Sequence, residues 1–223
     1  MICHSETKIS YSLNELARQC GLRVKFESAE LAPLPECGTF TDPRDGRTYK
    51  TVKIGRQIWL AENLAFDLAG SKVYGNNPAN LAKYGRLYDW ETAKKACPPG
   101  WHLPTNEDWD ELVCYADGTS GTDSPYDSPT AGKHLKATSG WYNNGNGTDD
   151  FGFSALPGGY GNSNGYFNTA GNYGRWWSAS EYNSYYAYSR RMDYSIEDVI
   201  YNYRDKGYLY SVRCLQDCGV GNA

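Results

Sequence analysis

The chain has 223 residues, of which 40% are hydrophobic and 22% charged, so it is long enough and apolar enough to bury a core and is not a disordered segment. Its net charge of −4, without any basic run longer than two residues, argues against nucleic acid as a partner. No apolar stretch approaches the roughly 20 residues that a membrane-spanning helix needs.

Tyrosine is unusually common, with 20 Tyr beside 7 Trp and 24 Gly. Tyrosine offers a large contact area and loses little conformational entropy on binding, which is why binding loops are rich in it. The alternative is a β-rich domain in which tyrosines pack on half-buried pleated surfaces. Composition alone leaves both interpretations open.

The spacing and number of the cysteines indicate the kind of cellular compartment in which the protein resides. The wide spacing of the seven cysteines favours disulfides between distant segments, and thus an oxidising compartment, although several buried reduced thiols are the alternative. No pair has the Cys-x-x-Cys spacing of a zinc knuckle or a thioredoxin-type site, and the odd count leaves at least one thiol free or paired between molecules. The first five residues lack the basic and apolar regions of a signal peptide, so either the protein is cytosolic as written or an export signal has been removed. The cysteines are Cys3, Cys20, Cys37, Cys97, Cys114, Cys214 and Cys218.

Residues 1–36 differ from the rest and are predicted to be an N-terminal extension. Ser12 and Glu15 have the spacing of a capping box, which predicts a short helix between strands at 8–11 and 22–26. This β-α-β pattern resembles the small module found ahead of secretins and TonB-dependent receptors. Pro33 and Pro35 then predict a linker, so the main domain is expected to span residues 37–218.

The main domain begins with a predicted hairpin and three predicted helices. Residues 48–54 and 57–60 alternate as strands around Gly55-Arg56. A first helix is predicted near 89–96, before Pro98-Pro99-Gly100. A second is capped by Thr105, and a short third begins after Ser128-Pro129. The second helix has Glu107 and Asp108 in its first turn, and Trp109, Leu112 and Val113 as its predicted buried stripe.

The C-terminal half is predicted to contain a long turn region followed by strands. Residues 140–174 contain ten Gly and many Asn, with aromatic anchors, and a long ordered loop region inside a domain is usually functional. Strands are predicted at 176–180, 186–194, 199–204 and 208–215. One of Trp176 and Trp177 should point inward, and the pattern does not say which. Period 2 places Tyr208, Tyr210, Val212 and Cys214 on one face of the last strand.

Nine of the twenty tyrosines lie between Tyr182 and Tyr210. Tyrosine and arginine are enriched among interface hot spots, and tyrosine faces also stack on sugar rings. The alternative for each of these residues is a solvent-facing strand position without a ligand. The predicted ligand-binding residues are Tyr182, Tyr185, Tyr186, Tyr188, Arg190, Tyr201, Tyr203 and Arg204.

The sequence offers little catalytic chemistry. There are three histidines: His4 lies in the extension, His134 is expected to be exposed beside Lys133, and His102 is interpreted as a structural packing residue instead of a base. The His-Glu-x-x-His zinc motif is absent. Residues 161–165 match Gly-x-Ser-x-Gly, but turns flank them where a nucleophile elbow needs a strand and a helix, so the match is interpreted as chance.

Six segments, taken in chain order, resemble the Fibrobacter succinogenes major paralogous domain over about residues 37–217. The resemblance implies an α+β, C-type-lectin-like fold with two main helices, a twisted antiparallel β-sheet and long Gly/Asn-rich loops. The segments are Gln57-x-Trp59-Leu60-Ala61-Glu62-Asn63-Leu64 within residues 45–64, Tyr84-Gly85-Arg86-Leu87-Tyr88-Asp89-Trp90, Cys97-Pro98-Pro99-Gly100-Trp101-His102-Leu103-Pro104-Thr105, residues 150–159, Trp176-Trp177-Ser178-Ala179-Ser180 and Ser211-Val212-Arg213-Cys214.

Proteins of this family are mostly exported or surface-attached, which implies an extracellular or cell-surface location. The family overlaps with the variable proteins of diversity-generating retroelements, which diversify a C-terminal surface rich in Asn, Tyr, Ser and Asp. Residues 182–210 have a similar composition, although family members that are not diversified have it too.

The sequence departs from calcium-dependent lectins, because their Glu-Pro-Asn or Gln-Pro-Asp and Trp-Asn-Asp tripeptides are absent. Asn77-Pro78-Ala79-Asn80 lacks the carboxylate that a Ca²⁺ site needs. Asp149 and Asp150 could contribute to a cation site, but paired Asp in a turn are usually solvated. No cofactor is therefore expected, with Ca²⁺ as the one alternative.

The resemblance also implies a disulfide between Cys97 and Cys214, which join the first helix to the last strand in lectin-like domains. Such a bridge is worth about 4–5 kcal/mol in the chain-entropy model. Cys37 and Cys218 are predicted to clip the ends of the domain together. A related fold is that of the formylglycine-generating enzymes, whose chemistry uses a Cys pair. Cys114 is the residue weighed here for such chemistry, and a buried inert thiol is the simpler interpretation.

The sequence thus predicts a non-enzymatic binding module for a protein or glycan. The alternatives are a structural surface component without a specific ligand and an enzyme related to formylglycine generation. An exposed aromatic patch would separate binding from structure, and a reactive thiol would indicate the enzyme.

Overall fold

The computed structural model describes residues 36–119 and 129–217. These residues belong to the second of the two units into which the chain divides, Pro35–Ala223. The predicted extension at 1–36, apart from its last residue, lies outside the described residues, as does Cys218, so the Cys37–Cys218 pairing stays a prediction. Within the described ranges, the structure has a few short helices and several largely antiparallel sheets, which is an α+β architecture.

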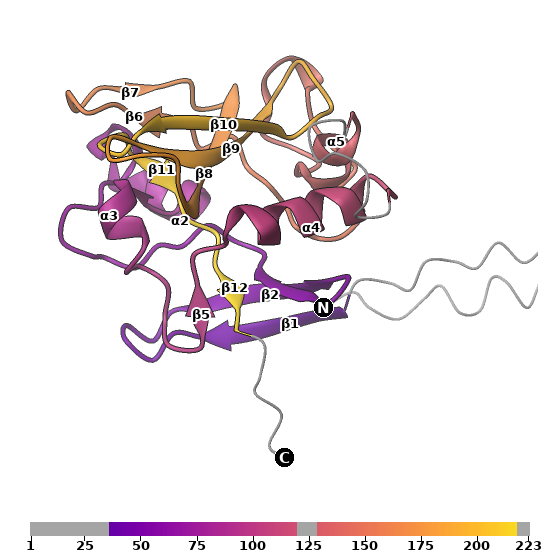
Figure 1. Cartoon of the computed structure of the whole chain (residues 1–223), viewed down its shortest axis with the longest axis horizontal. Helices are drawn as coiled ribbons and strands as arrows, with labels where there is room; N and C mark the ends of the chain where they lie inside the picture. Colours follow the sequence, from indigo (N-terminus) through magenta and orange to yellow (C-terminus); the bar gives the residue numbers. More distant parts are fainter. Residues whose placement is uncertain (1–35, 120–128, 218–223) are drawn as a thin grey trace, which may run out of the picture. The chain divides into compact units, whose positions relative to one another are not determined.

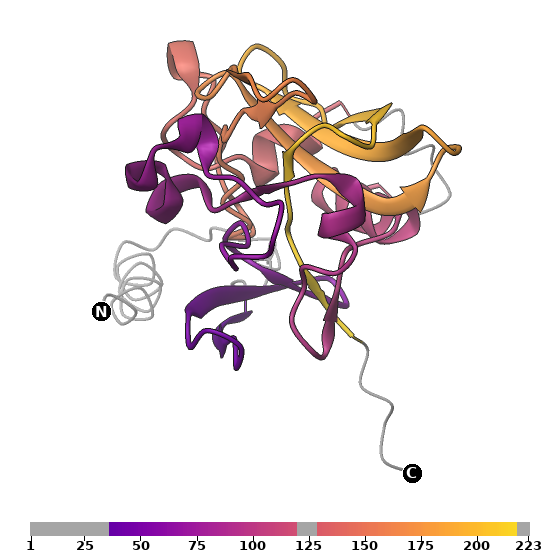
Figure 2. The same ribbon diagram turned by 90° about the vertical axis from the view of Figure 1, so that its left-hand side faces the viewer.

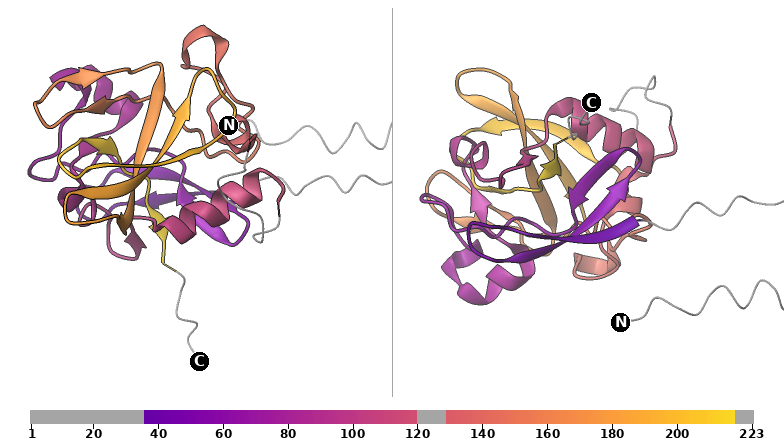
Figure 3. Two further views of the ribbon diagram at one scale, coloured as in Figure 1. Left: turned by 45° about the horizontal axis from the view of Figure 1, so that its top comes forward. Right: turned by 90° about the horizontal axis from the view of Figure 1, so that it is seen from below.

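The first sheet has five strands, and every pairing in it is antiparallel. Its central hairpin is the predicted one, because Ile54 pairs with Gln57 across a turn in which Gly55 has φ +59°. The right-hand view of Figure 3 looks onto the purple strands of this sheet. In spatial order the strands are β1 (Glu36–Thr41), β2 (Thr48–Ile54), β3 (Gln57–Leu60), β12 (Leu215–Gln216) and β5 (Trp101–His102).

The predicted binding residues lie on the second sheet and on the loop between its strands β8 and β9, which Figure 1 labels. Its three long strands pair antiparallel, and β11 pairs parallel with β8 at a single position. A separate two-stranded hairpin joins β6 (Tyr160–Gly161) to β7 (Phe167–Asn168). In spatial order the second sheet consists of β10 (Ile200–Asp205), β9 (Tyr186–Asp193), β8 (Tyr173–Glu181), β11 (Tyr210–Ser211) and β4 (Leu87–Tyr88).

The longest described helix is α4 (Asn106–Ala116), as the capping pattern predicts. Thr105 accepts a hydrogen bond from the backbone N–H of Asp108 at 3.2 Å, and the Asp108 carboxylate accepts one from the Thr105 N–H at 2.8 Å. The predicted stripe of Trp109, Leu112 and Val113 is buried. In the described part of the chain, no helix combines the length and apolar composition needed to cross a membrane.

The other helices are short. The first predicted helix is confined to α3 (Trp90–Ala93), because the next backbone bonds, from Lys95 to Thr92 and from Ala96 to Ala93, span only three residues and tighten the chain. The third predicted helix is α5, and in the described residues it spans Ala131–Leu135. The remaining pieces are η1 (Tyr74–Asn76), η2 (Pro78–Asn80), α2 (Leu81–Tyr84) and η4 (Tyr142–Asn144).

Two hydrophobic cores lie on opposite faces of β8. Trp176 packs in the first core with Trp59, Trp109 and other residues from β2, β3 and α4, whereas Trp177 packs in the second with Tyr210. The expectation that only one of these tryptophans points inward was wrong, since both are 0% exposed. Alternation sends successive side chains to opposite faces, and here both faces are covered. The left-hand view of Figure 3 shows α4 beside the purple strands of the first sheet.

The predicted single strand at 208–215 was also wrong, because this segment leaves one sheet and enters the other. It contributes β11 and β12, and between them the backbone N–H groups of Leu60 and Leu64 donate to the carbonyls of Cys214 and Val212. Figure 2 shows this yellow segment descending from the second sheet to the first. Tyr210, Val212 and Cys214 share the second core, with Tyr208 packed against it, as their spacing predicts.

The predicted disulfide between Cys97 and Cys214 is confirmed. It joins the turn after α3 to the segment that crosses between the sheets, across a sequence separation of 117 residues. Cys214 is fully buried in the second core. The bridge therefore ties the C-terminal part of the domain to the end of the first predicted helix, as the resemblance implies.

Candidate binding surface

Five of the predicted tyrosines form one surface at the β9–β10 end of the second sheet. We call Tyr182, Tyr186, Tyr188, Tyr201 and Tyr203 the tyrosine surface. Tyr203 lies opposite Tyr188 in the strand register, and Asp205 lies opposite Tyr186. Because paired residues share a face and alternate residues repeat it, β9 and β10 send these four tyrosines to one side. Tyr182 reaches the same side from the loop after β8.

The rings of the tyrosine surface pack on one another. Tyr182 and Tyr203 stack with centroids 4.2 Å apart and planes 8° apart, and Tyr188 lies 4.8 Å from Tyr201. Tyr182 and Tyr188 meet edge to face at 5.4 Å. Such contacts favour fixed ring positions. Yet Tyr182, Tyr186 and Tyr203 are still 46%, 40% and 43% exposed, so the ordered rings face solvent.

The loop that carries Tyr182 and Tyr185 is held by hydrogen bonds. The Asn183 side-chain oxygen accepts from the N–H groups of Tyr185 and Tyr186, both at 2.9 Å. Lys206 pairs with Glu181 and donates to the Ser184 carbonyl. Tyr185 is the most exposed of the predicted residues, at 72%. A loop fixed in this way loses less entropy when it binds a partner.

Arg190 does not lie on the exposed part of this surface. It shares the face of Tyr188, but it is 1% exposed and its guanidinium pairs with Asp110 of α4 at 2.5 Å. It also donates to the Asn106 side chain at 3.2 Å and lies 4.3 Å from the ring of Tyr201. Burial raises the pKa of Asp110, and the Arg190 charge opposes that shift. Helix α4 covers this end of the face, so Arg190 supports Tyr201 from beneath.

Arg204 lies on the opposite face of the sheet. It pairs with Ala187 in the register, one position away from the Tyr203–Tyr188 pair, so alternation turns its side chain away from the tyrosines. Its guanidinium donates to the Asn202 side chain at 2.6 Å and to the Tyr203 carbonyl at 2.8 Å. The eight predicted residues thus divide into four exposed and two half-buried tyrosines, a buried arginine that supports them and an arginine on the other face.

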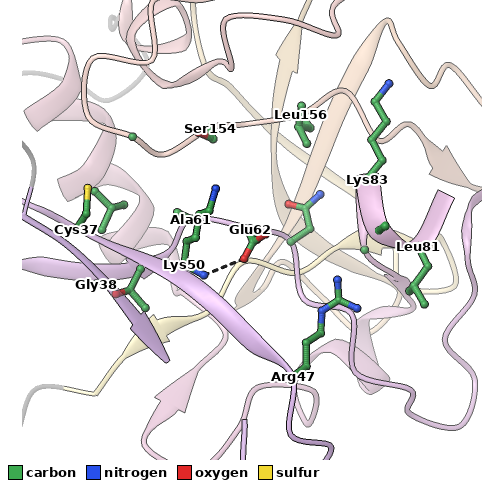
Figure 4. A pocket seen from close by; sticks show the side chains of 16 residues that line it. Cys37, Gly38, Arg47, Lys50, Ala61, Glu62, Leu81, Lys83, Ser154 and Leu156 are labelled. Atoms are coloured by element: carbon green, nitrogen blue, oxygen red, sulfur yellow. Dashed lines mark hydrogen bonds between the residues drawn. The ribbon is translucent and has the colours of Figure 1, made fainter. Parts of the chain in front are cut away.

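A separate cavity of about 470 Å³ lies beside the first sheet and contains none of the predicted binding residues (Figure 4). Basic side chains of Arg47, Lys50 and Lys83 line it, with one carboxylate, Glu62. The Glu62 carboxylate accepts a hydrogen bond from the Lys50 backbone N–H at 2.8 Å. Sequence analysis missed this cavity, although Glu62 stands within one of the family-like segments.

The residues weighed for catalysis have structural partners. His102 lies with Nδ1 2.6 Å from Asp217 and Nε2 3.4 Å from Asp108, so it links β5, the cap of α4 and the end of β12 by ionic contacts, where packing was expected. The hydrogen bond to Asp108, above all, raises the pKa of His102, and burial opposes that shift. His134 is half-buried and contacts Asp150 at 2.5 Å. Cys114 is a free thiol buried in α4.

The Asp149–Asp150 turn and the Gly-x-Ser-x-Gly match were also weighed for chemistry. Asp149 accepts hydrogen bonds from the N–H and hydroxyl of Ser154, and burial raises its pKa against these bonds. In the ranges that the structure describes, no group of three or more His, Cys, Asp or Glu is placed to hold a metal ion. Residues 161–165 comprise the last residue of β6 and the turn toward β7, so the chain there is a hairpin without the helix of a nucleophile elbow.

Comparison with known proteins gives one family. A model of the Fibrobacter succinogenes major domain matches residues 52–216, which is more than half of the chain. The chain belongs to this family. No curated protein and no solved structure matches it.

In this Fibrobacter succinogenes major domain, the family-like segments meet in a buried polar cluster, which we call the Asn63–Arg213 hub. The Asn63 side-chain oxygen accepts from Trp176 Nε1 at 2.9 Å and from Arg213 Nη2 at 3.1 Å. Arg213 also donates to the carbonyls of Leu60 and Phe153. Burial lowers the pKa of Arg213 to about 9. The family-like residues therefore build the core, and the tyrosine surface lies outside them.

Proposed function

We propose that this domain is a non-enzymatic recognition module of the C-type-lectin-like class, which binds a protein or glycan through the tyrosine surface. The observation that carries the proposal is the combination of ring packing and exposure. Tyr182, Tyr186 and Tyr203 are held by aromatic neighbours and are still at least 40% exposed. Ordered exposed aromatic rings offer contact area at low entropic cost.

Two further observations support the proposal, one on the location of the protein and one on the composition of the loop. The Cys97–Cys214 disulfide favours an oxidising compartment, and hence an extracellular or surface location. Around Tyr182 the turn also carries Asn183, Ser184 and Tyr185, all exposed, and this composition is compatible with a diversified recognition loop. Loops on a rigid scaffold tolerate such change because their side chains do not build the core.

The alternatives have less support. An enzyme related to formylglycine generation needs an accessible reactive thiol, whereas Cys114 is 6% exposed inside α4. A structural surface component without a ligand would leave the rings of Tyr182 and Tyr203 with only a packing role. Binding measurements separate these functions.

The test compares three proteins on a glycan array and a surface-protein array. These are the wild type, the triple variant Tyr182→Ala/Tyr186→Ala/Tyr203→Ala, and a matched control, Tyr166→Ala. Tyr166 is 70% exposed but lies between β6 and β7, outside the tyrosine surface. We expect a ligand of the wild type to be retained by the control and lost by the triple variant, with both variants folded by near-ultraviolet circular dichroism.

Undiminished binding by the folded triple variant would move the site away from the tyrosine surface. No binding by any of the three proteins would favour the structural surface component. Loss of binding in Tyr166→Ala alone would contradict the proposal and place the site at the β6–β7 hairpin.

A further inference from the structure

Three arginines gather on the face of the second sheet opposite to the tyrosine surface. Arg175 of β8 lies directly across from Arg191 of β9 in the strand register. Arg204 of β10 belongs to the same face, because it pairs with Ala187, four residues from Arg191. We call Arg175, Arg191 and Arg204 the arginine cluster. Like charges directly opposite one another destabilise a sheet, so this arrangement needs a reason.

Arg175 is the least satisfied member of the cluster. It is 7% exposed, and its Nε and Nη1 atoms are buried without a hydrogen-bond partner. The Nε of Arg191 is buried in the same way. A buried donor without an acceptor costs about 1–3 kcal/mol, and more when it is charged. Native proteins seldom keep such groups without an unseen partner such as water or an ion.

The surroundings of Arg175 supply aromatic rings and positive charge. Its guanidinium carbon lies 5.0 Å from the ring centroid of Tyr160, 5.4 Å from that of Tyr173 and 5.7 Å from that of Tyr210. Burial lowers the pKa of Arg175, and Arg191 and Arg204 lower it further, while Tyr210 and Tyr160 oppose them. Arg191 contacts the carboxylate of Asp193 at 3.8 Å. Cation–π contacts stabilise the charge but accept no hydrogen bond in the guanidinium plane.

Three other buried cations of the described chain have acceptors, and Arg175 differs from them in having two buried nitrogens without one. Arg190 pairs with Asp110. Arg213 donates to Asn63 and to backbone carbonyls. Lys136, 2% exposed, donates to the carbonyls of Asp193 and Ile196. The protein thus supplies acceptors for buried cations where the fold alone requires them, and it supplies none for two nitrogens of Arg175.

We propose that the arginine cluster binds an oxyanion, a carboxylate, sulfate or phosphate group of a ligand, above Arg175 and between Arg191 and Arg204. Guanidinium groups present planar pairs of donors that match such oxygens. Arg191 is 22% exposed and Arg204 is half-buried, so the approach runs over these two residues. The rings of Tyr160, Tyr173 and Tyr210 surround the Arg175 guanidinium, and the attraction between charges is stronger beside apolar rings than in water. The site is independent of the tyrosine surface, because the two lie on opposite faces of the sheet.

The test uses inorganic and small organic anions on the whole chain. Sodium sulfate, sodium phosphate and sodium acetate are titrated at constant ionic strength, with chloride as the balance, and binding is followed by Tm and by calorimetry. Sulfate and phosphate stabilise most proteins by exclusion, so only a saturable rise counts as binding. A response to acetate alone assigns the site to carboxylates, and a response to sulfate and phosphate assigns it to tetrahedral oxyanions.

Two variants and one control locate the site. Arg191→Gln should weaken binding at least tenfold, and Arg175→Gln should abolish the saturable rise in Tm. Without the anion, Arg175→Gln should be as stable as the wild type or more stable, because it removes a buried charge without an acceptor. The control is Arg56→Gln, whose side chain is 87% exposed and which pairs with Glu111 on another part of the surface.

The proposal requires the control to bind as the wild type does. An equal saturable response in the wild type and Arg191→Gln would overturn it, as would the absence of any saturable response to all three anions. Should Arg175→Gln fail to fold, the comparison of Arg191→Gln with Arg56→Gln decides the question.

Discussion

The Asn63–Arg213 hub and the tyrosine surface both include residues of the second sheet, but one is buried and the other faces solvent. Trp176 of β8 donates to Asn63 in the interior, whereas Tyr188 and Tyr203 lie on neighbouring strands at a solvent-facing edge. The hub includes residues of four family-like segments, namely Asn63, Phe153, Trp176 and Arg213. The tyrosine surface lies outside those segments, although the family model spans both. In this chain the family-like motifs build the core, and the surface that we propose for binding consists of aromatic residues outside them.

The largest expected effect comes from the cross-link of the core. Replacing both Cys97 and Cys214 with Ala should lower the free energy of unfolding by about 4–5 kcal/mol in the chain-entropy model, given the separation of 117 residues. Urea unfolding of the double variant under oxidising conditions measures this loss. Cys114→Ala serves as the control, since it removes a buried thiol without removing the bridge. A double variant no less stable than Cys114→Ala would contradict the structural role of the bridge.

The comparison of hub and surface is sharpest in a pair of single variants. Asn63→Leu removes the acceptor of Trp176 Nε1 and Arg213, so two buried donors lose a partner and the free energy of unfolding should fall by about 3 kcal/mol. Tyr203→Ala removes ring contacts on the exposed side and should cost no more than about 1 kcal/mol. Both values come from urea midpoints with a common slope. Equal losses would erase the distinction between hub and surface.

The smallest effect concerns His102, which ties β12 to the cap of α4. The pKa of His102 is raised, so its contribution to stability is fully present below the unfolded value of about 6.5 and is lost as pH rises through the folded pKa. The pKa of Asp108 is lowered, chiefly by the hydrogen bond to His102, so its contribution is present above about 3.9 and is lost as pH falls through the folded pKa. The two together favour an optimum in mildly acidic solution.

His102→Gln tests this pH dependence. The His102 side chain is 39% exposed, so solvent screening should keep the effect below about 1 kcal/mol. Tm measured from pH 4 to pH 9 should fall less on the alkaline side in the variant than in the wild type. Parallel curves for the two proteins would show that the contacts with Asp108 and Asp217 do not contribute to stability.

The sequence predicted secondary structure best where the pattern depends on interactions within a few residues. The β2–β3 hairpin and α4 follow from alternation, turn residues and a capping box, all of which act within a few residues. The tyrosine surface was predictable for the same reason, because period 2 groups Tyr186 with Tyr188 and Tyr201 with Tyr203 before their register is known. The same alternation places Arg204, which follows Tyr203 directly, on the opposite face, so spacing could have excluded it from the surface. Arg190 has the spacing of Tyr186 and Tyr188, and spacing alone could not show that it is buried.

Only the tertiary structure decided which faces are covered. Trp176 and Trp177 are both buried because the two cores enclose both faces of β8, and Arg190 is buried because α4, 80 residues away at Asp110, packs over it. The sequence by itself determined most strands, since those depend on residue type and local spacing, and its motifs determined the family, whose resemblance implied the bridge between Cys97 and Cys214. Burial depends on contacts between distant segments, and no local pattern reports them.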